Sequence, residues 1–305
     1  MNNKEFEIEL AKLLEPIQQP LKLILHVGTP KTGTTSLQVY LDKKYSMLKK
    51  KGILYPKRTH NSDAPTHQWF EKNLVRTHPQ NLLDNFKGIL SEVDENTHTI
   101  LLSSEGIYNR WWDFPTESKA LLTVLNELSD VNIWVWFKEP LIFAEDFYKQ
   151  CMRNPLVKDI PCYGKDLSFA EVLKDPWFKQ RLDYMGFVNE CDQIFGKSSI
   201  SIFECNTDTV QTVRELLGIA TPHDSPAPRK NKSLNAITTE LYRIINRLEL
   251  SAKEKEKIVP HMHEINTALT SYAARSNESL IDKESRDEII KMTSAGMRKL
   301  QTRFE

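Results

Sequence analysis

The residues best suited to chemistry stand in one short stretch, HVGTPKTGTTSLQ, at positions 26–38. Its two glycines, Gly28 and Gly33, let a backbone curl around an anion so that successive N–H groups point inward. Lys31 adds a full positive charge between them, and the threonines offer hydroxyl groups (Thr32, Thr34 and Thr35). The pattern therefore predicts a loop that binds a phosphate or sulfate group.

The segments on either side predict the elements that position this loop. LKLILHV at 21–27 is short and apolar and is bounded by Pro and Gly, which predicts a buried strand, and the residues from 34 to 50 predict a helix. The N-terminus of such a helix carries roughly half a positive charge, which favours a bound anion. The spacing G-x-x-x-x-G matches a Walker A loop, but that loop ends in Gly-Lys-Ser/Thr, whereas Thr34 follows Gly33 here.

At these residues the chain resembles the sulfotransferases that use 3′-phosphoadenosine 5′-phosphosulfate (PAPS), whose loop reads Pro-Lys-Ser/Thr-Gly-Thr-Ser/Thr after the first strand. The form GTPKTGTTSLQ, followed by GILYP at 52–56, is similar to bacterial carbohydrate-type members, and the resemblance covers about residues 21–250. It implies that Lys31 stabilises the charge that builds on the bridging oxygen as the sulfuryl group leaves. It also implies that the loop holds the cofactor (Gly28, Thr29, Pro30, Lys31, Thr32, Gly33, Thr34 and Thr35).

The second half of the cofactor site departs from the family pattern. The family has Arg-x-Pro after the fourth strand and a Ser eight residues after the Arg, and both the Arg and the Ser hold the 3′-phosphate. Lys138 stands here for the Arg and Asp146 for the Ser. Lysine keeps the charge but lacks the two-pronged guanidinium, and aspartate puts an anion where a phosphate should bind. A local ion pair between the two is the alternative interpretation.

A basic stretch later in the chain offers further ligands for the 3′-phosphate. Arg229-Lys230-Asn231-Lys232-Ser233-Leu234 matches the family's Asn-x-Ser-Leu pattern after a basic linker. The resemblance implies that Arg229, Lys230 and Ser233 contact the cofactor. A solvated basic linker is the alternative.

An acceptor group also needs a base near the transferred group. His67 lies in the segment after the second strand, from which related sugar sulfotransferases take their His or Glu base, and the pKa of histidine suits that task. Glu105 ends the third predicted strand, at the edge where parallel sheets bind ligands, and is either the base or a partner that orients Lys31 or His67. No set of residues has the spacing of a metal site.

The alternation of strands and helices predicts an α/β fold, in which a P-loop-type parallel sheet of about five strands is flanked by helices. The predicted strands are 21–27, 53–56, 99–104, 131–137 and 199–203, and only helical patterns follow residue 234. We expect residues 1–233 to form a sulfotransferase-like core. Residues 234–305 are expected to be a helical C-terminal extension packed on that core, within a single domain.

Composition narrows the class of protein. The 305 residues contain 41 Lys and Arg against 41 Asp and Glu, and this zero net charge argues against a protein that coats nucleic acid. No apolar run approaches the roughly 18–20 residues of a membrane helix. The four cysteines have no C-x-x-C spacing, so we expect reduced thiols and a cytoplasmic location.

Together these features predict a PAPS-dependent sulfotransferase. It would need no metal and would release adenosine 3′,5′-bisphosphate. The acceptor would be a hydroxyl or amine of a carbohydrate, a glycolipid or a small metabolite. A P-loop kinase, with Glu105 as a Walker B-like carboxylate, is one alternative. A non-catalytic or divergent nucleotide-binding member, suggested by Lys138 and Asp146, is the other. No pattern in the sequence names the acceptor or an oligomeric state.

Overall fold

The computed structural model of the chain describes residues 1–17, 20–60, 64–205, 208–219, 233–248, 250–272 and 278–304. The chain divides into two compact units. The first comprises Met1–Lys138, Met185–Lys230 and Leu300–Glu305, and the second comprises Glu139–Tyr184 and Asn231–Lys299. The division into 1–233 and 234–305 stays a prediction.

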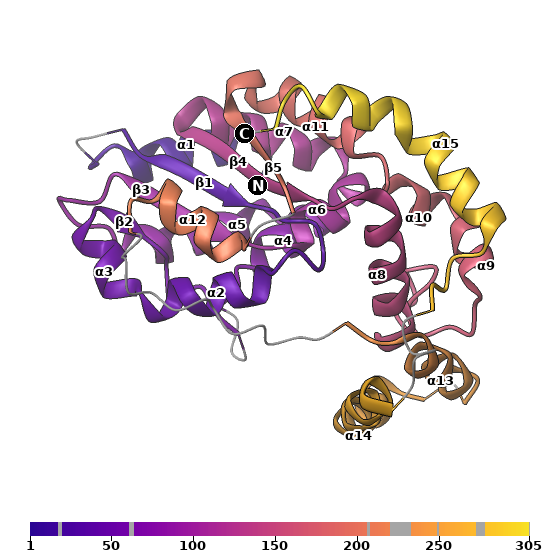
Figure 1. Cartoon of the computed structure of the whole chain (residues 1–305). Coiled ribbons are helices and arrows are strands. Elements are labelled where there is room, and N and C mark those ends of the chain that lie inside the picture. Colours follow the sequence, from indigo (N-terminus) through magenta and orange to yellow (C-terminus); the bar gives the residue numbers. More distant parts are fainter. Residues whose placement is uncertain are drawn as a thin grey trace. The chain divides into compact units, whose positions relative to one another are not determined.

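The first unit is built on a five-stranded parallel sheet in the order β2-β3-β1-β4-β5 (Figure 1). In the register of the sheet, Leu25 of β1 lies beside Leu102 of β3 on one side and Ile133 of β4 on the other. The α/β fold with a central parallel sheet is therefore confirmed. The strands are β1 (Lys22–His26), β2 (Ile53–Leu54), β3 (Thr99–Ser103), β4 (Asp130–Phe137) and β5 (Ile200–Glu204).

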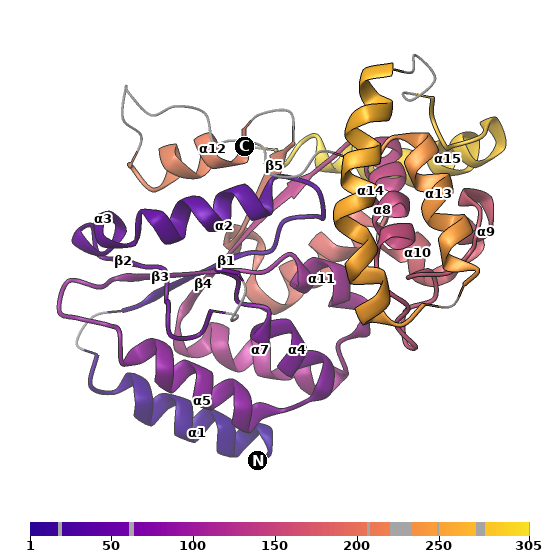
Figure 2. The ribbon, with the colours of Figure 1, turned by 90° about the horizontal axis from the view of Figure 1, so that it is seen from below.

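Helices cover both faces of this sheet, which explains why its strands are almost continuously apolar. Figure 2 shows one group of helices on one face and a second group on the other. The first group is α2 (Thr34–Lys43), α3 (Tyr45–Lys50) and α12 (Thr209–Leu216). The second group includes α1 (Asn3–Leu14), α4 (Trp69–Arg76), α5 (Pro79–Leu90) and α7 (Thr116–Leu128).

The strand order places the predicted loop at the point where the chain changes faces. From the central strand β1 the chain continues into α2, whereas from its neighbour β3 it continues through α6 (Gly106–Arg110) and η1 (Trp111–Asp113) to α7 on the opposite face. Adjacent strands that lead to opposite faces leave a crevice at their carboxyl ends, and ligands of open α/β sheets bind there. Residues 28–33 and Glu105 both follow strands at this edge.

Two segments with helical spacing of apolar residues are each divided in the structure. The helix expected over 34–50 is interrupted at Lys44, between α2 and α3. Residues 178–195, which have the same kind of spacing, are interrupted at Arg181–Asp183, between α10 (Pro176–Gln180) and α11 (Tyr184–Phe195). Apolar periodicity continues across both interruptions, so the pattern alone could not locate them.

The second unit is helical. Its elements are α8 (Pro140–Arg153), α9 (Phe169–Lys174), α10, α13 (Ala236–Asn246), α14 (Ala252–Tyr272) and α15 (Lys283–Leu300, of which Leu300 belongs to the first unit). The buried Lys255 of α14 donates hydrogen bonds to the main-chain oxygen of Met152 and to Asn246 Oδ1, at 2.8 and 2.6 Å. A cation at these carbonyls suits the negative end of helix α8. In the described part of the chain, no helix has the length and apolarity that a membrane crossing requires.

Candidate active site

The loop that joins β1 to α2 is held by hydrogen bonds from its own threonines. Thr29 Oγ1 donates to the main-chain oxygen of Trp136 in β4 at 2.8 Å, and Thr32 Oγ1 donates to the main-chain oxygen of Thr29 at 2.7 Å. The Thr209 hydroxyl at the start of α12 donates to the main-chain oxygen of Thr32. The side chains of Thr29 and Thr32 therefore shape the loop from inside. The Thr29 N–H also donates to the main-chain oxygen of Trp136, at 3.3 Å, so the polar groups of Thr29 are engaged within the protein. The predicted cofactor contact of Thr32 would have to come from its main-chain N–H.

The backbone of the loop turns through positive φ at three of its six residues. These are Gly28 (φ +21°), Lys31 (φ +70°) and Gly33 (φ +88°). Alternation of left- and right-handed residues directs neighbouring N–H groups toward one point and makes an anion-binding concavity. At Lys31 this conformation is strained, since an L-residue with a side chain loses about 1–2 kcal/mol there. Strain of this kind at a charged loop residue is a mark of a functional site.

The first turn of α2 is left without side-chain compensation for its positive end. Gly33 at the N-cap has no side chain, and the first turn contains no acidic residue. Helix α1, by contrast, begins with a capping box in which the side chains of Asn2 and Glu5 each bond to the other's backbone N–H. An uncapped, uncompensated helix end beside a lysine is an environment that stabilises a bound anion. Thr35 is exposed in this turn, whereas Thr34 is buried.

Replacing Gly33 by alanine should lower the free energy of unfolding by about 1–2 kcal/mol, because the residue keeps a positive φ. Gly218 (φ +61°) is a matched control, since a β-carbon fits there too and it lies outside the loop. We expect both variants to lose similar stability in denaturant titrations. Only Gly33→Ala should weaken binding of adenosine 3′,5′-bisphosphate in calorimetry. Equal binding by the two variants would mean that the loop does not hold the anion.

Glu105 lies beside the loop, as its position after β3 predicted. Burial raises the pKa of its carboxyl group, and the charge of Lys31 and the Thr34 hydroxyl both oppose that rise. The structure therefore brings Lys31, Thr34 and Glu105 together, all within the first unit. This arrangement favours the role of Glu105 as a partner that orients Lys31.

His67, which we expected to be the base, is unsuited to that role. Its ring is fully buried, with Nδ1 accepting the Ser103 N–H at 3.1 Å and Nε2 lying 3.0 Å from the main-chain oxygen of Pro56. With Nδ1 as an acceptor, the proton is on Nε2 and is donated to Pro56. Burial lowers the pKa of His67 to about 3. Both ring nitrogens thus bind backbone groups, and the structure argues against His67 as the group that takes a proton from an acceptor.

His67→Ala should therefore act on stability more than on turnover. Two buried backbone groups would lose their partner, at roughly 1–3 kcal/mol each. The melting temperature should fall by several degrees, while turnover per folded molecule, measured well below that temperature, changes by less than about threefold. His78→Ala, at an exposed position, should change neither quantity. A large loss of turnover without loss of stability would restore His67 as the base.

Glu71 is a candidate base that the sequence analysis missed. It lies on α4, is only 5% exposed, and its Oε2 accepts the Ser104 hydroxyl at 2.6 Å. Burial raises the pKa of Glu71 to about 7, against the lowering effect of that hydrogen bond. Gly106 leaves room for the carboxylate, since a β-carbon there would lie 2.5 Å from Glu71 Oε1.

Ser104 connects Glu71 to the loop edge, because the Ser104 N–H bonds to the main-chain oxygen of His26 at 3.0 Å. The charge of Glu105 contributes to the raised pKa of Glu71, so the two carboxyl groups are close enough to interact. Glu71 stands in the same segment after the second strand in which we expected the base. Its position four residues after His67 was the signal available in the sequence.

The residues predicted to hold the 3′-phosphate are divided between the two units. Lys138 belongs to the first unit, and Asp146 and Ser233 belong to the second, where the Ser233 hydroxyl donates to Asp146 Oδ1 at 2.7 Å. Asp146 and Ser233, two positions that the family pattern assigns to the 3′-phosphate, therefore lie within hydrogen-bond distance of each other. Arg229 and Lys230 lie outside the described residues. The 3′-phosphate site stays a prediction.

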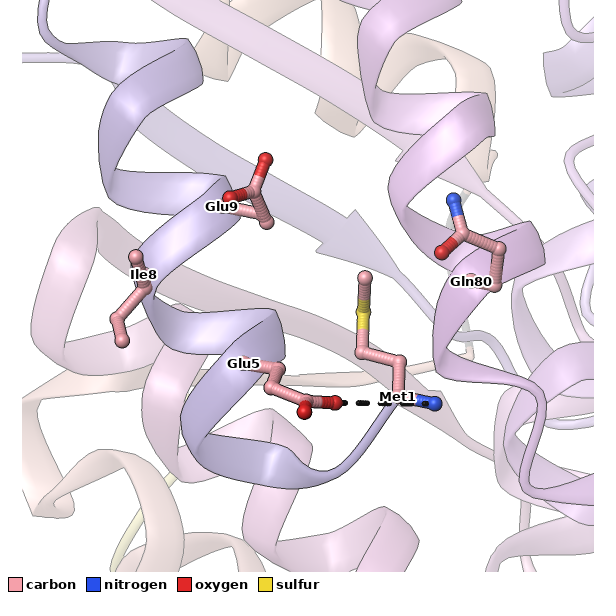
Figure 3. Close-up of a pocket in the computed structure, with 5 residues that line it drawn as sticks. All are labelled: Met1, Glu5, Ile8, Glu9 and Gln80. Carbon is pink, nitrogen blue, oxygen red and sulfur yellow. Dashed lines mark ion pairs between the residues drawn. The ribbon is translucent and has the colours of Figure 1, made fainter.

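A separate pocket of about 450 Å³ lies on the helices of the first unit (Figure 3). It is lined by Met1, Glu5, Ile8, Glu9 and Gln80. Two carboxylates in its lining make it unsuited to an anion. Within the described ranges, no group of three or more His, Cys, Asp or Glu side chains has the arrangement of a metal site.

Comparison with known proteins gives one distant structural likeness. No protein-family model matches the chain, and no curated protein matches it. Among solved structures, the chain is similar to one described as "Crystal Structure of Sulfotransferase from Alicyclobacillus acidocaldarius", with 15% identity and a TM-score of 0.40. The match covers 74% of this chain and 93% of that one. A likeness this distant does not establish a family, so function has to be inferred from the site residues.

Proposed function

We propose that this chain is a sulfotransferase that moves a sulfuryl group from PAPS to a hydroxyl or amine of a small molecule or saccharide. The observation that carries the proposal is the loop from Gly28 to Gly33. There a strained Lys31 stands inside a concave backbone, before an uncapped helix. Sulfuryl transfer, like phosphoryl transfer, is catalysed by positioning and by charge stabilisation, and this site offers both.

In the proposed reaction the acceptor oxygen attacks the sulfur of PAPS, and the bond from sulfur to the bridging oxygen breaks. The Lys31 ammonium stabilises the negative charge that develops on the departing phosphate oxygen. The N–H groups of residues 32–35 and the exposed Thr35 hydroxyl hold the 5′-phosphate. Glu105 keeps Lys31 directed at the bridging oxygen. The Lys31 charge acts to lower the pKa of Glu105, which supports the pairing of these two residues.

Glu71 takes the proton of the acceptor hydroxyl in this scheme. A general base is most effective when its pKa lies near the working pH, and the pKa of Glu71 is raised to about 7. The Ser104 hydroxyl holds the carboxylate at the carboxyl end of β3. Protonated Glu71 then returns its proton to solvent after the product leaves.

Incubation with PAPS labelled with ³⁵S and a panel of mono- and disaccharides, amino sugars and phenols tests this function. We expect label in at least one acceptor, release of adenosine 3′,5′-bisphosphate, and no loss of turnover in EDTA.

A kinase is the second candidate, because Glu105 beside Thr34 resembles a carboxylate placed to act at a P-loop. Transfer of ³²P from ATP that requires Mg²⁺, with no transfer of ³⁵S, would favour the kinase.

A further inference from the structure

His26, the last residue of β1, carries a buried nitrogen that lies next to the loop. Its side chain is 0% exposed, and its Nδ1 lies 2.8 Å from Ser103 Oγ. Gln38 of α2 donates from Nε2 to the same Ser103 oxygen at 3.1 Å. The other ring nitrogen of His26, Nε2, has no hydrogen-bond partner in the described part of the protein.

His26 Nε2 and two hydroxyl groups of the loop all lie close to Gly28. A β-carbon built on Gly28 would lie 3.1 Å from His26 Nε2, 3.0 Å from Thr34 Oγ1 and 3.2 Å from Thr32 Oγ1. The nitrogen and both hydroxyls thus surround the first residue of the loop. An unpartnered buried polar atom costs about 1–3 kcal/mol, so a native protein keeps one where a ligand, an ion or a water completes it.

The hydrogen-bond chain favours one tautomer of His26. The Gln38 amide can only donate to Ser103 Oγ, which leaves the Ser103 hydroxyl proton to be donated in turn. If that proton goes to His26 Nδ1, the neutral ring carries its own proton on Nε2. Burial, which lowers the pKa of His26 to about 3, keeps the ring neutral. The Tyr55 hydroxyl, which donates to the main-chain oxygen of Pro65, also lies near Ser103 and is the competing acceptor.

We propose that His26 is a positioning residue for the anion that the loop binds. Its Nε2–H donates to Thr34 Oγ1 when the loop is occupied, and the Thr34 hydroxyl then donates its own proton to an oxygen of the 5′-phosphate instead of to the Glu105 carboxyl group. The inference rests on the proposed function, because it needs a phosphate in the loop. It assigns Gln38, Ser103 and His26 to one hydrogen-bond chain that runs from α2 through β3 to the phosphate.

Nuclear magnetic resonance of protein labelled with ¹⁵N tests the tautomer and the contact together. With adenosine 3′,5′-bisphosphate as the probe, we expect His26 to be the Nε2–H tautomer at neutral pH. Its Nε2 resonance should shift on saturation, together with the amides of Lys31 and Gly33. Shifts at Lys31 and Gly33 with an unchanged His26 ring, or a ring protonated on Nδ1, would overturn the role of His26 alone. No shift at any of these residues would overturn the proposed function and this inference together.

Substitution of His26 distinguishes a positioning role from a purely structural one, because only the positioning role predicts a change in nucleotide affinity. His26→Phe should raise the Kd for adenosine 3′,5′-bisphosphate and the KM for PAPS about tenfold, the scale of one hydrogen bond, with kcat nearly unchanged. His26→Gln, whose amide can donate, should recover part of the affinity. Trp177→Phe removes another unpartnered buried nitrogen, in α10 of the second unit, and should leave Kd unchanged. Equal weakening by His26→Phe and Trp177→Phe would mean that the effect is a general loss of stability.

Discussion

Replacing Lys31 with alanine is expected to lower sulfuryl transfer at saturating PAPS by about 100-fold or more, the scale of losing one positioned electrostatic group. Lys31 is the cation inside the concave loop, and Glu105 is close enough for their charges to interact. In the proposed reaction its charge acts on the oxygen that becomes negative as the sulfur–oxygen bond breaks. The loss should therefore appear in kcat as well as in the affinity for PAPS.

Two further variants separate the charge of Lys31 from its conformation. Lys31→Gly removes the charge and also relieves the strain of φ +70°, so it should unfold no more easily than the wild type and still be inactive. Lys43→Ala removes an exposed lysine from the end of α2 and should behave as the wild type. Normal turnover in Lys31→Gly or Lys31→Ala would rule out the mechanism proposed here.

Glu71→Gln should lower kcat by roughly 10²- to 10⁴-fold, the contribution of a general base. A base acts in its deprotonated form, and the pKa of Glu71 is raised to about 7. Turnover of the wild type should therefore rise as the pH increases through about 7 and level off above it. In Glu71→Gln this rise should disappear, because glutamine keeps the shape of the side chain but does not titrate.

Glu105→Gln provides the comparison for Glu71→Gln. If Glu105 orients Lys31, its loss should lower turnover while the rise through pH 7 remains. Persistence of that rise in Glu71→Gln, together with its disappearance in Glu105→Gln, would make Glu105 the base. The pH profiles of kcat for the wild type and these two variants decide between the assignments.

The sheet was predictable because its strands are buried on both faces. Runs such as LKLILHV and VNIWVWF leave few alternatives to a buried strand, and all five predicted strands are present. The loop between the first strand and the next helix was predictable for a similar reason, because the apolar run ends at Gly28 and helical spacing begins near Thr34. Its use in binding a phosphate stays a prediction. The conformation of Lys31 was not predictable, because a positive φ at lysine depends on the surrounding loop being fixed by Trp136 and Thr209.

The base could not be chosen from the sequence because the choice depends on tertiary contacts. His67 and Glu71 stand four residues apart, and histidine has the more suitable unperturbed pKa. In the fold, His67 bonds to Pro56 and Ser103, which lie 11 and 36 residues away along the chain. Burial lowers the pKa of His67 to about 3 and raises the pKa of Glu71 to about 7. His67 and Glu71 are buried because the segment that contains α4 packs against β3. A local sequence pattern does not predict this packing.

The most direct test of the central claim is a calorimetric titration of the wild type and Lys31→Ala with adenosine 3′,5′-bisphosphate in EDTA, and with ATP in the presence and absence of Mg²⁺. The loop from Gly28 to Thr35 is proposed to hold the 5′-phosphate of a PAPS-type nucleotide without a metal. We expect the bisphosphate to bind the wild type in EDTA, at least about tenfold more tightly than ATP under either condition, and to bind Lys31→Ala more weakly. Binding of ATP that requires Mg²⁺, with no measurable binding of the bisphosphate, would contradict the assignment.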